Sequence, residues 1–255
     1  MDGARTDAAE DSTVGTSGTT ALSYVVPAHN STVAIEATLH ALAARLDGMD
    51  AEVVVVENGS TDGTPELLAR LQREWASPGV RLVVLTSDKG MGNAYRTGIA
   101  ASRGDRVLLT ADDLPFGFDD LDAALELDAA SHPVVIGSKG HRDSDVDRGL
   151  LRRVLTGGFW LLRRVVLGMR TLDPQGTFVV DGAWLRSIAP QLSEGGYLLS
   201  TELCFLAERS GLVPVEVPVR LSAAHRDHAS RITPGDVWQM GVGLLGIRRR
   251  HATRP

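Results

Sequence analysis

The chain has 255 residues, is 43% apolar and carries a formal net charge of -6. Its length suits one sizeable α/β domain, and its single cysteine, Cys204, excludes an intrachain disulfide framework. No stretch resembles a signal peptide or reaches the ~18 consecutive uncharged apolar residues of a membrane-spanning helix, so we expect a cytoplasmic protein.

Residues 1–21 are polar and predict a disordered tail. From residue 22 to 138, short apolar runs alternate with segments of helical spacing. Because the runs are continuous, they indicate a mostly parallel, Rossmann-like α/β sheet covered by helices on both faces. The predicted strands cover 22–26, 52–57, 80–86, 106–111 and 133–138, and the predicted helices cover 31–46, 64–75, 92–103 and 118–130.

The second part of the chain is basic. The first 145 residues carry 11 Lys and Arg against 23 Asp and Glu, whereas the remainder carries 15 against 9. This excess suits an anionic surface or a phosphate, although ordinary solvated helix faces explain it equally well. No basic-aromatic pattern favours nucleic acid. The predicted elements here are a helix over 148–170, interrupted at Gly157-Gly158, a strand over 177–181, a helix over 198–212, a strand over 213–221 and a helix over 236–251.

Polar groups follow the first three predicted strands, where ligands of open α/β sheets bind. The first two strands end in "VVPAHN" and "VVVVENGSTDGT". The second ending places Glu57 and Asn58 before a glycine turn, which either presents hydrogen-bonding groups to a base and ribose or is only turn chemistry. The third strand ends in "SDKGMGNAYR", where Gly90 and Gly92 open a helix and suit phosphate oxygens.

Two adjacent carboxylates, Asp112 and Asp113, follow the fourth strand in "VLLTADDLPFG". Carboxylates at a strand end can bind a hard divalent cation, which neutralises a diphosphate. Equally, they are surface acids ahead of the helix predicted over 118–130. The residues alone leave both interpretations open.

Taken together and in this order, the four strand ends resemble the family 2 glycosyltransferases, which have a GT-A, nucleotide-diphospho-sugar-binding fold. That family usually shows "VIPAYN", "VDDGSTDGT", an "N-x-G-x-G-x-A" helix and an Asp-x-Asp metal motif at these places. The resemblance covers residues 22–251 and narrows to the dolichyl-phosphate β-glucosyltransferase and dolichyl-phosphate mannosyltransferase branch. The segments that resemble this branch are "VVIGSKGHRDS", "RGLLRRVLTGGFWLL", "LDPQGTFVV" and "DVWQMGVGLLGIRRR".

The resemblance implies a metal-dependent, inverting hexosyltransferase that uses Mg²⁺ or Mn²⁺. Its donor would be a UDP- or GDP-hexose, with UDP-glucose favoured, and its acceptor a polyprenyl or dolichyl phosphate. One GT-A domain would then hold a nucleotide-sugar-binding half, 22–138, and an acceptor-binding half, 139–251. The segments 148–170 and 236–251 either lie at the inner face of a membrane or pack against the sheet.

The resemblance also implies roles for individual residues. Asp113 and Asp112 would hold the metal ion, and Asp113, Glu202 and Asp173 are the catalytic candidates. Glu202 would act as a base or as an orienting group. The donor candidates are Pro27, His29, Asn30, Glu57, Asn58, Asp62, Lys89, Gly90, Arg96 and Asp112, and the candidates for the acceptor phosphate are Lys139, Arg148, Arg152, Ser230 and Arg231.

The chain departs from the family pattern at two places. Ala111 stands where the first metal aspartate is usual, and Glu57-Asn58 replaces a pair of aspartates. The loss of the first metal aspartate leaves a non-catalytic sugar-nucleotide-binding protein as one alternative, although Glu202, Arg148 and Arg152 argue against it. The membrane anchor often seen in the eukaryotic glucosyltransferase is not expected here, which leaves transfer to a soluble, secondary-metabolite acceptor as another alternative. A nucleotidyltransferase of related fold is disfavoured, because "VVPAHNSTVAIE" lacks a glycine-rich activation loop.

Overall fold

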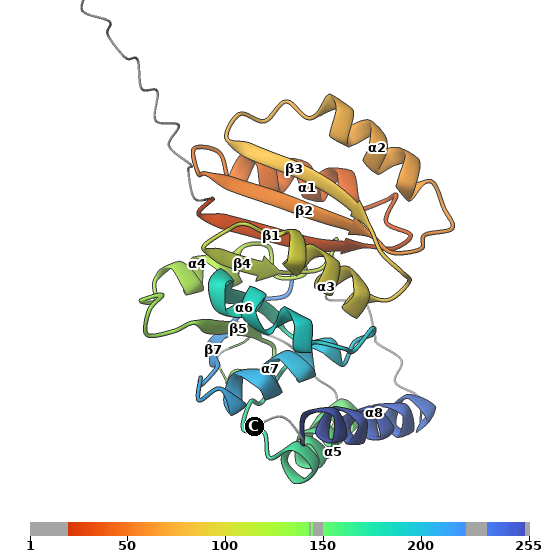
Figure 1. The fold of residues 1–255 in the computed structure, drawn as a ribbon, viewed down its shortest axis with the longest axis vertical. Coiled ribbons are helices and arrows are strands. Elements are labelled where there is room, and N and C mark those ends of the chain that lie inside the picture. Colours follow the sequence, from red (N-terminus) through yellow and green to blue (C-terminus); the bar gives the residue numbers. More distant parts are fainter. Residues whose placement is uncertain (1–19, 143, 145–149, 223–233, 253–255) are drawn as a thin grey trace, which may run out of the picture.

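The computed structural model describes residues 20–142, 144, 150–222 and 234–252. Strands and helices alternate along most of this length (Figure 1). The strands are β1 (Leu22–Ala28), β2 (Ala51–Glu57), β3 (Val80–Thr86), β4 (Arg106–Leu109), β5 (Val134–Ser138), β6 (Thr177–Asp181) and β7 (Val215–Pro218). The helices are α1 (Ile35–Arg45), α2 (Thr64–Glu74), α3 (Met91–Ala101), α4 (Asp119–Leu125), α5 (Leu150–Leu167), α6 (Gly182–Ile188), α7 (Leu199–Arg209) and α8 (Pro234–Ala252), with a 3₁₀ turn over Ala189–Gln191.

The described strands form one sheet in the order β3-β2-β1-β4-β6-β5-β7. β6 runs antiparallel to both of its neighbours, β4 and β5, whereas the other pairs are parallel. The predicted mostly parallel sheet is therefore confirmed. Because β6 is reversed, its first residues lie at the same edge of the sheet as the last residues of the other strands.

The valines of β2 show why the strand sequences are continuously apolar. Val54 and Val56 point to one face of the sheet, where they pack with α3, α6, α7 and α8. Val53 and Val55 point to the other face, where they pack with α1, α2 and α4. Successive side chains of a strand alternate between faces, so a sheet buried on both sides needs an apolar residue at every position. The predicted helical cover on both faces is confirmed.

Several predicted boundaries were wrong. The strand predicted over 106–111 ends at Leu109, which pairs with Phe178 near the start of β6. The helix predicted over 118–130 ends at Leu125, because its buried apolar residues are confined to its first two turns. The predicted interruption at Gly157-Gly158 does not occur, and α5 runs through both glycines. Burial of Phe159 and Leu162 against the core offsets the low helix propensity of glycine.

The last two residues of the predicted tail are hydrogen-bonded to the rest of the protein, and the last helix packs beside α5. Thr20 and Ala21, which belong to the predicted tail, are hydrogen-bonded to Asp105 and Asp50, and residues 1–19 lie outside the described residues. α5 and α8 lie side by side at the end of the molecule away from β3 (Figure 1). The described helices α5 and α8 therefore pack against each other as well as against the core.

Candidate active site

The loops that follow β1 and β2 interlock at the edge of the sheet. Asn30 N–H donates to Ser60 Oγ at 3.0 Å, and Thr61 N–H donates to Asn30 Oδ1 at 2.9 Å. Asn30 has a φ of 54°, a left-handed conformation that asparagine tolerates better than most residues. The backbone N–H and the side-chain oxygen of Asn30 thus both join the two loops, which gives this donor candidate a clear structural role.

The donor candidates Glu57 and His29 lie on this joined pair of loops. Glu57 is buried, and its Oε1 accepts the Ser60 N–H at 2.5 Å. His29 is half-buried and directly follows β1, of which Pro27 is part. Its Nδ1 is buried and has no hydrogen-bond partner among the described residues. A buried polar atom without a partner is costly, so this nitrogen is available to a ligand.

Asp62 belongs to the start of α2. Its carboxylate accepts the Thr64 N–H at 3.0 Å and the Thr32 hydroxyl at 3.1 Å. The hydrogen bonds from Thr64 and then from Thr32 lower the pKa of Asp62. This aspartate closes a turn, as turn aspartates commonly do, and its carboxylate is engaged without a ligand.

The glycines at the start of α3 have a packing role. Gly90 has a φ of 129°, and a Cβ at Gly90 would collide with the carbonyl oxygen of Gly195. A Cβ at Gly92 would likewise collide with the carbonyl oxygen of Glu194. The segment 193–196, which lies far away in the sequence, therefore covers the amino end of α3. On the other side, Lys89 lies against Gly59, and Arg96 is exposed on α3.

Asp112 is fixed from two sides, whereas Asp113 is exposed. Ser31 Oγ donates to Asp112 Oδ2, and Thr38 Oγ1 donates to the Asp112 carbonyl oxygen at 2.7 Å. Behind them, the buried hydroxyl of Tyr95 donates to the Thr110 carbonyl oxygen at 3.0 Å. Burial raises the pKa of Tyr95, and the charges of Asp112 and Asp113 raise it further. The aspartate pair thus lies between the loops of β1 and the start of α3.

The chemistry of this pair suits a divalent cation that is shared with a ligand. The described residues include no cluster of three or more His, Cys, Asp or Glu side chains able to hold a metal ion alone. Mg²⁺ is commonly held by one or two carboxylates together with substrate phosphates and water, and Mn²⁺ also prefers oxygen ligands. Asp112 and Asp113 provide such a set, although Ala111 removes one expected carboxylate.

Lys139 and Asp173 lie farther along the same edge. Lys139 follows β5, and its Nζ lies 5.3 Å from the ring centroid of Phe116, in the loop after the aspartate pair. Asp173 precedes β6 and accepts N–H groups of Gly140 and Gln175, both at 3.2 Å. The reversed direction of β6 therefore brings Asp173 to the segment that carries Lys139.

Glu202 lies inside the protein, in the first turn of α7. Its carboxylate is 0% exposed and accepts hydrogen bonds from Ser193 and from the Glu194 N–H. Burial opposes its ionisation, but the hydrogen bonds from Glu194, His251 and Ser193 outweigh it and lower the pKa of Glu202. This geometry favours the orienting role over the role of a base.

Four of the predicted acceptor residues cannot be placed. Arg148, Ser230 and Arg231 lie outside the described residues, and Arg152 belongs to a part of α5 whose side chains lie outside them. Conversely, sequence reasoning missed Ser31, Thr38 and Tyr95, which support the aspartate pair. The only signal for Ser31 was its position directly after "VVPAHN".

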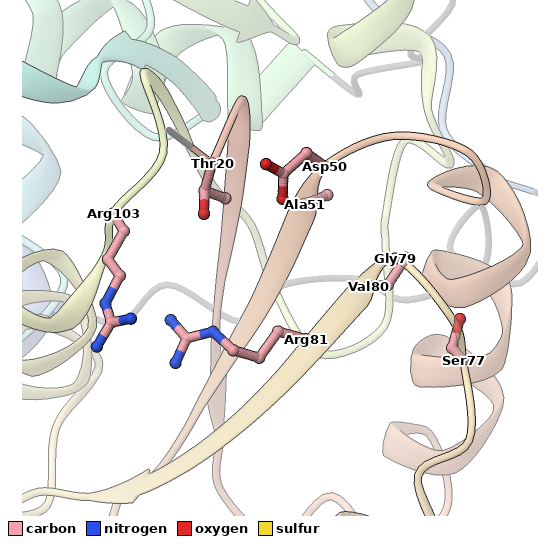
Figure 2. A pocket seen from close by; sticks show the side chains of 8 residues that line it. All are labelled: Thr20, Asp50, Ala51, Ser77, Gly79, Val80, Arg81 and Arg103. Carbon is pink, nitrogen blue, oxygen red and sulfur yellow. The ribbon is translucent and has the colours of Figure 1, made fainter. Parts of the chain in front are cut away.

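A cavity of about 480 Å³ lies at the opposite edge of the sheet, where β2 and β3 begin. Figure 2 shows the guanidinium groups of Arg81 and Arg103 on one side of it. Arg81 is paired with the buried carboxylate of Glu52, which also accepts the Arg103 N–H at 2.6 Å. This cavity contains none of the candidate residues at the carboxyl ends of the strands, and Asp50 adds a negative charge to its lining. It is therefore separate from the candidate site.

The fold and the strand-end residues together define an α/β protein of the nucleotide-diphospho-sugar-binding class. The family model described as glycosyl transferase family 2 matches residues 23–190. The chain belongs to this family, as its motifs predict, and is a glycosyltransferase by class.

Curated relatives extend the similarity over most of the chain. It is 29% identical to dolichyl-phosphate beta-glucosyltransferase of Drosophila melanogaster, with 90% of this chain and 75% of the relative covered. It is 28% identical to the Homo sapiens protein of the same name, with 93% and 78% covered. The predicted resemblance to this branch is confirmed.

The solved structures support the fold. Glucosyl-3-phosphoglycerate synthase from Mycobacterium tuberculosis, in complex with Mn²⁺, UDP-glucose and phosphoglyceric acid, matches with a TM-score of 0.60 and 21% identity. The match covers 92% of this chain and 81% of that chain. At this identity the comparison concerns the fold, and it confirms the GT-A prediction.

Proposed function

We propose that the protein transfers a hexose from a nucleotide sugar to a polyprenyl or dolichyl phosphate, with inversion at the anomeric carbon. The observation that carries this proposal is the aspartate pair after β4, tied by Ser31 to the interlocked loops of β1 and β2. The names of the relatives, matched over about three quarters of their length, supply the donor sugar and the acceptor class. UDP-glucose is the proposed donor.

The nucleoside would lie over the joined loops of β1 and β2. His29 offers a buried ring nitrogen without a partner among the described residues, and Glu57 and Asn58 lie at the end of the neighbouring strand. These groups suit the hydrogen-bonding edge of a base and the hydroxyls of a ribose. Lys89, beside Gly59, and Arg96, on α3, supply positive charge for the diphosphate.

Asp113, with Asp112, would hold Mn²⁺ or Mg²⁺ at the diphosphate. A bound divalent cation stabilises the charge that develops on a departing diphosphate. Within the protein, Ser31 and Thr38 hold Asp112 in place, and Asp113 is exposed. Tyr95 is a neutral phenol at neutral pH, as any tyrosine is, and burial and the two aspartates raise its pKa further.

A lipid phosphate needs little help from a base. The second pKa of a phosphate monoester is about 6, so the attacking oxygen is already anionic near neutral pH. The protein then has to orient the phosphate, and Lys139 is the described residue that suits this task. Arg148, Arg152, Ser230 and Arg231 are further candidates. If the acceptor were a hydroxyl group, Asp173 would be the better base, because it lies beside the segment of Lys139.

The paired helices α5 and α8 suit the surface of an anionic membrane. Leu161 and Val165 on α5, and Val242 and Leu245 on α8, are exposed apolar residues. Arg164 and Arg248 lie on the same two helices, and such cations favour anionic headgroups. No described helix combines the length and hydropathy required to span a bilayer. We therefore propose peripheral attachment at the inner, cytoplasmic face.

One part of the predicted interfacial segment has another role. Arg163 is 2% exposed and donates to the carbonyl oxygens of Thr171 and Leu172 at 3.2 and 2.8 Å. It ties α5 to the segment before β6. Of the two alternatives for the segment 148–170, Arg163 therefore follows packing inside the protein, since its partners are backbone carbonyl groups.

The proposal is tested by incubating the protein with labelled UDP-glucose, Mn²⁺ and one acceptor. The acceptors compared are a polyprenyl phosphate, the matching polyprenol and a soluble hydroxyl compound. The expected result is transfer to a polyprenyl phosphate and none to the matching polyprenol, because only the phosphate carries an ionised nucleophile. Transfer only to a soluble hydroxyl acceptor would support the alternative substrate class. Absence of transfer and of donor hydrolysis, with UDP-glucose still bound, would support a non-catalytic binding protein.

A further inference from the structure

The segment 193–196 packs directly against the start of α3 and is hydrogen-bonded to it. Asn93 N–H donates to the Gly195 carbonyl oxygen at 3.1 Å, and the Asn93 side chain donates to the Lys89 carbonyl oxygen at 3.1 Å. Gly90 and Gly92 allow the two backbones to touch, since a Cβ at either position would collide with 194–196. The position of Lys89 therefore depends on a segment about a hundred residues away.

Glu202 anchors the start of that segment through hydrogen bonds. Its Oε2 accepts the N–H groups of Ser193 and Glu194 at 2.8 and 2.9 Å, and its Oε1 accepts the Ser193 hydroxyl at 2.8 Å. Glu202 lies in the first turn of α7, which is packed into the core. The carboxylate is thus a rigid anchor for the start of the segment 193–196.

The end of α8 closes the same network. His251 is 3% exposed, and its Nε2 lies 2.9 Å from Glu202 Oε1. The neighbouring Arg250 is paired with the carboxylate of Glu194. Arg209, from α7, donates to the His251 carbonyl oxygen at 2.6 Å. Two consecutive residues of α8 therefore contact Glu194, which belongs to the segment 193–196, and Glu202, which anchors the start of that segment.

We infer that Glu202 is a positioning residue that links the end of α8, through the segment 193–196, to the donor-binding side of the site. This inference rests on the proposed function in one respect, because it takes Lys89 and its neighbours as part of the nucleotide-sugar site. Glu202 does not act as the base, since its buried oxygens are occupied by Ser193, Glu194 and His251. Arg250 and His251 are its partners in this task.

Two substitutions of Glu202 separate positioning from base catalysis. Glu202→Gln keeps a carbonyl oxygen for the two N–H groups, and its amide can still pair with Ser193 and His251. Glu202→Ala removes the anchor altogether. A base would lose its function in both variants, whereas a positioning residue is largely rescued by glutamine.

The test measures UDP affinity by calorimetry with Mn²⁺, and the KM and kcat of transfer, in the full chain. We expect Glu202→Ala to weaken UDP binding and raise the donor KM by about tenfold or more, with little change in the acceptor KM. Glu202→Gln should stay within about threefold of the wild type in UDP affinity and in kcat.

Arg250→Ala is the second variant, because Arg250 is 41% exposed and its removal leaves the core intact. Arg250→Ala should weaken UDP binding by about threefold. The control is Arg249→Ala, at the exposed neighbouring position, which should leave UDP binding unchanged. Unaltered UDP affinity in both Glu202→Ala and Arg250→Ala overturns the inference, and so does a hundredfold loss of kcat in Glu202→Gln with normal UDP affinity. If Glu202→Ala does not fold, Arg250→Ala decides alone. Failure of the wild type itself to bind UDP contradicts the proposed function, and the inference falls with it.

Discussion

The hydroxyl of Ser31 donates a hydrogen bond to the carboxylate of Asp112, although the two residues are 81 positions apart. Ser31 follows β1, and Asp112 follows β4, which pairs with β1 in the sheet. One hydrogen bond therefore joins the loop proposed for the nucleoside to the carboxylates proposed for the cation. The hydrogen bond holds the Asp112 carboxylate in one orientation, beside the exposed Asp113.

Replacement of Ser31 by alanine tests this connection. The loss of a hydrogen bond to a carboxylate should weaken Mn²⁺-dependent UDP binding by about three- to tenfold, because Asp112 becomes free to turn. Calorimetric titration of UDP at several Mn²⁺ concentrations measures the effect. Thr32→Ala, which removes an exposed hydrogen bond to Asp62, serves as the control and should show no such change.

The two aspartates should differ in importance. Asp113→Ala should abolish detectable metal-dependent transfer, and Asp112→Ala should reduce it less, since Asp112 already bonds to Ser31. The measurement is initial rate against Mn²⁺ and Mg²⁺ concentration. Asp122→Ala, on the exposed face of α4, is the control. Near wild-type turnover of Asp113→Ala would remove the metal assignment.

The glycines of α3 and α5 predict opposite effects of alanine. Gly92→Ala should lower the free energy of unfolding by about 1–3 kcal/mol and weaken UDP binding, because the new methyl group meets the carbonyl groups of 194–196. Gly157→Ala should raise the free energy of unfolding by about 1 kcal/mol, since the position is helical and a Cβ there would meet no other atom. Denaturant unfolding measures both. Stabilisation by Gly92→Ala would contradict the described contact.

Asp120 should make the stability depend on pH. Burial raises its pKa above the ordinary value of 3.8. A carboxyl group whose pKa is higher in the folded state stabilises the fold below pH 3.8, and this stabilisation is lost as the pH rises through the raised pKa. The free energy of unfolding of the wild type, minus that of Asp120→Asn, should therefore fall as the pH rises from 4 towards neutrality. A difference independent of pH would show that Asp120 ionises normally.

The exposed apolar residues of α5 test the proposed membrane face. Val165→Asp is expected to reduce binding to anionic vesicles by at least about threefold, because the residue is 69% exposed and would lie among acyl chains. Flotation with liposomes is the measurement. Val33→Asp is a matched control, since Val33 is 95% exposed in the loop after β1. Equal losses in both variants would contradict a specific face.

The sequence predicts much of the fold because sheet burial leaves a local pattern. The four valines of β2 divide between two cores, so their continuous run indicates a strand covered on both sides. The same periodicity carries no information about the direction of β6. Its position between β4 and β5 depends on pairing of Phe178 with Leu109 and Ile136, which are distant in the sequence.

The candidate site could be predicted where it follows strand ends, and not where distant segments meet. Asp112 and Asp113 could be proposed because an apolar run ends shortly before them, although β4 itself ends at Leu109. The position of Glu202 depends on Ser193 and His251, and the burial of Arg163 depends on carbonyl groups of Thr171 and Leu172. Such partners are set by the packing of α5, α7 and α8, which hydrophobic patterns do not specify residue by residue.

The proposed reaction is inverting transfer of glucose from UDP-glucose to a polyprenyl phosphate at the aspartate pair. The most direct measurement is the structure of the lipid product by nuclear magnetic resonance, with Asp113→Ala in parallel. We predict a β-linked glucosyl phosphate from the wild type, with release of UDP, and no product from the variant. An α-linked product would contradict inversion, and equal product from both proteins would contradict a role of Asp113 in the reaction.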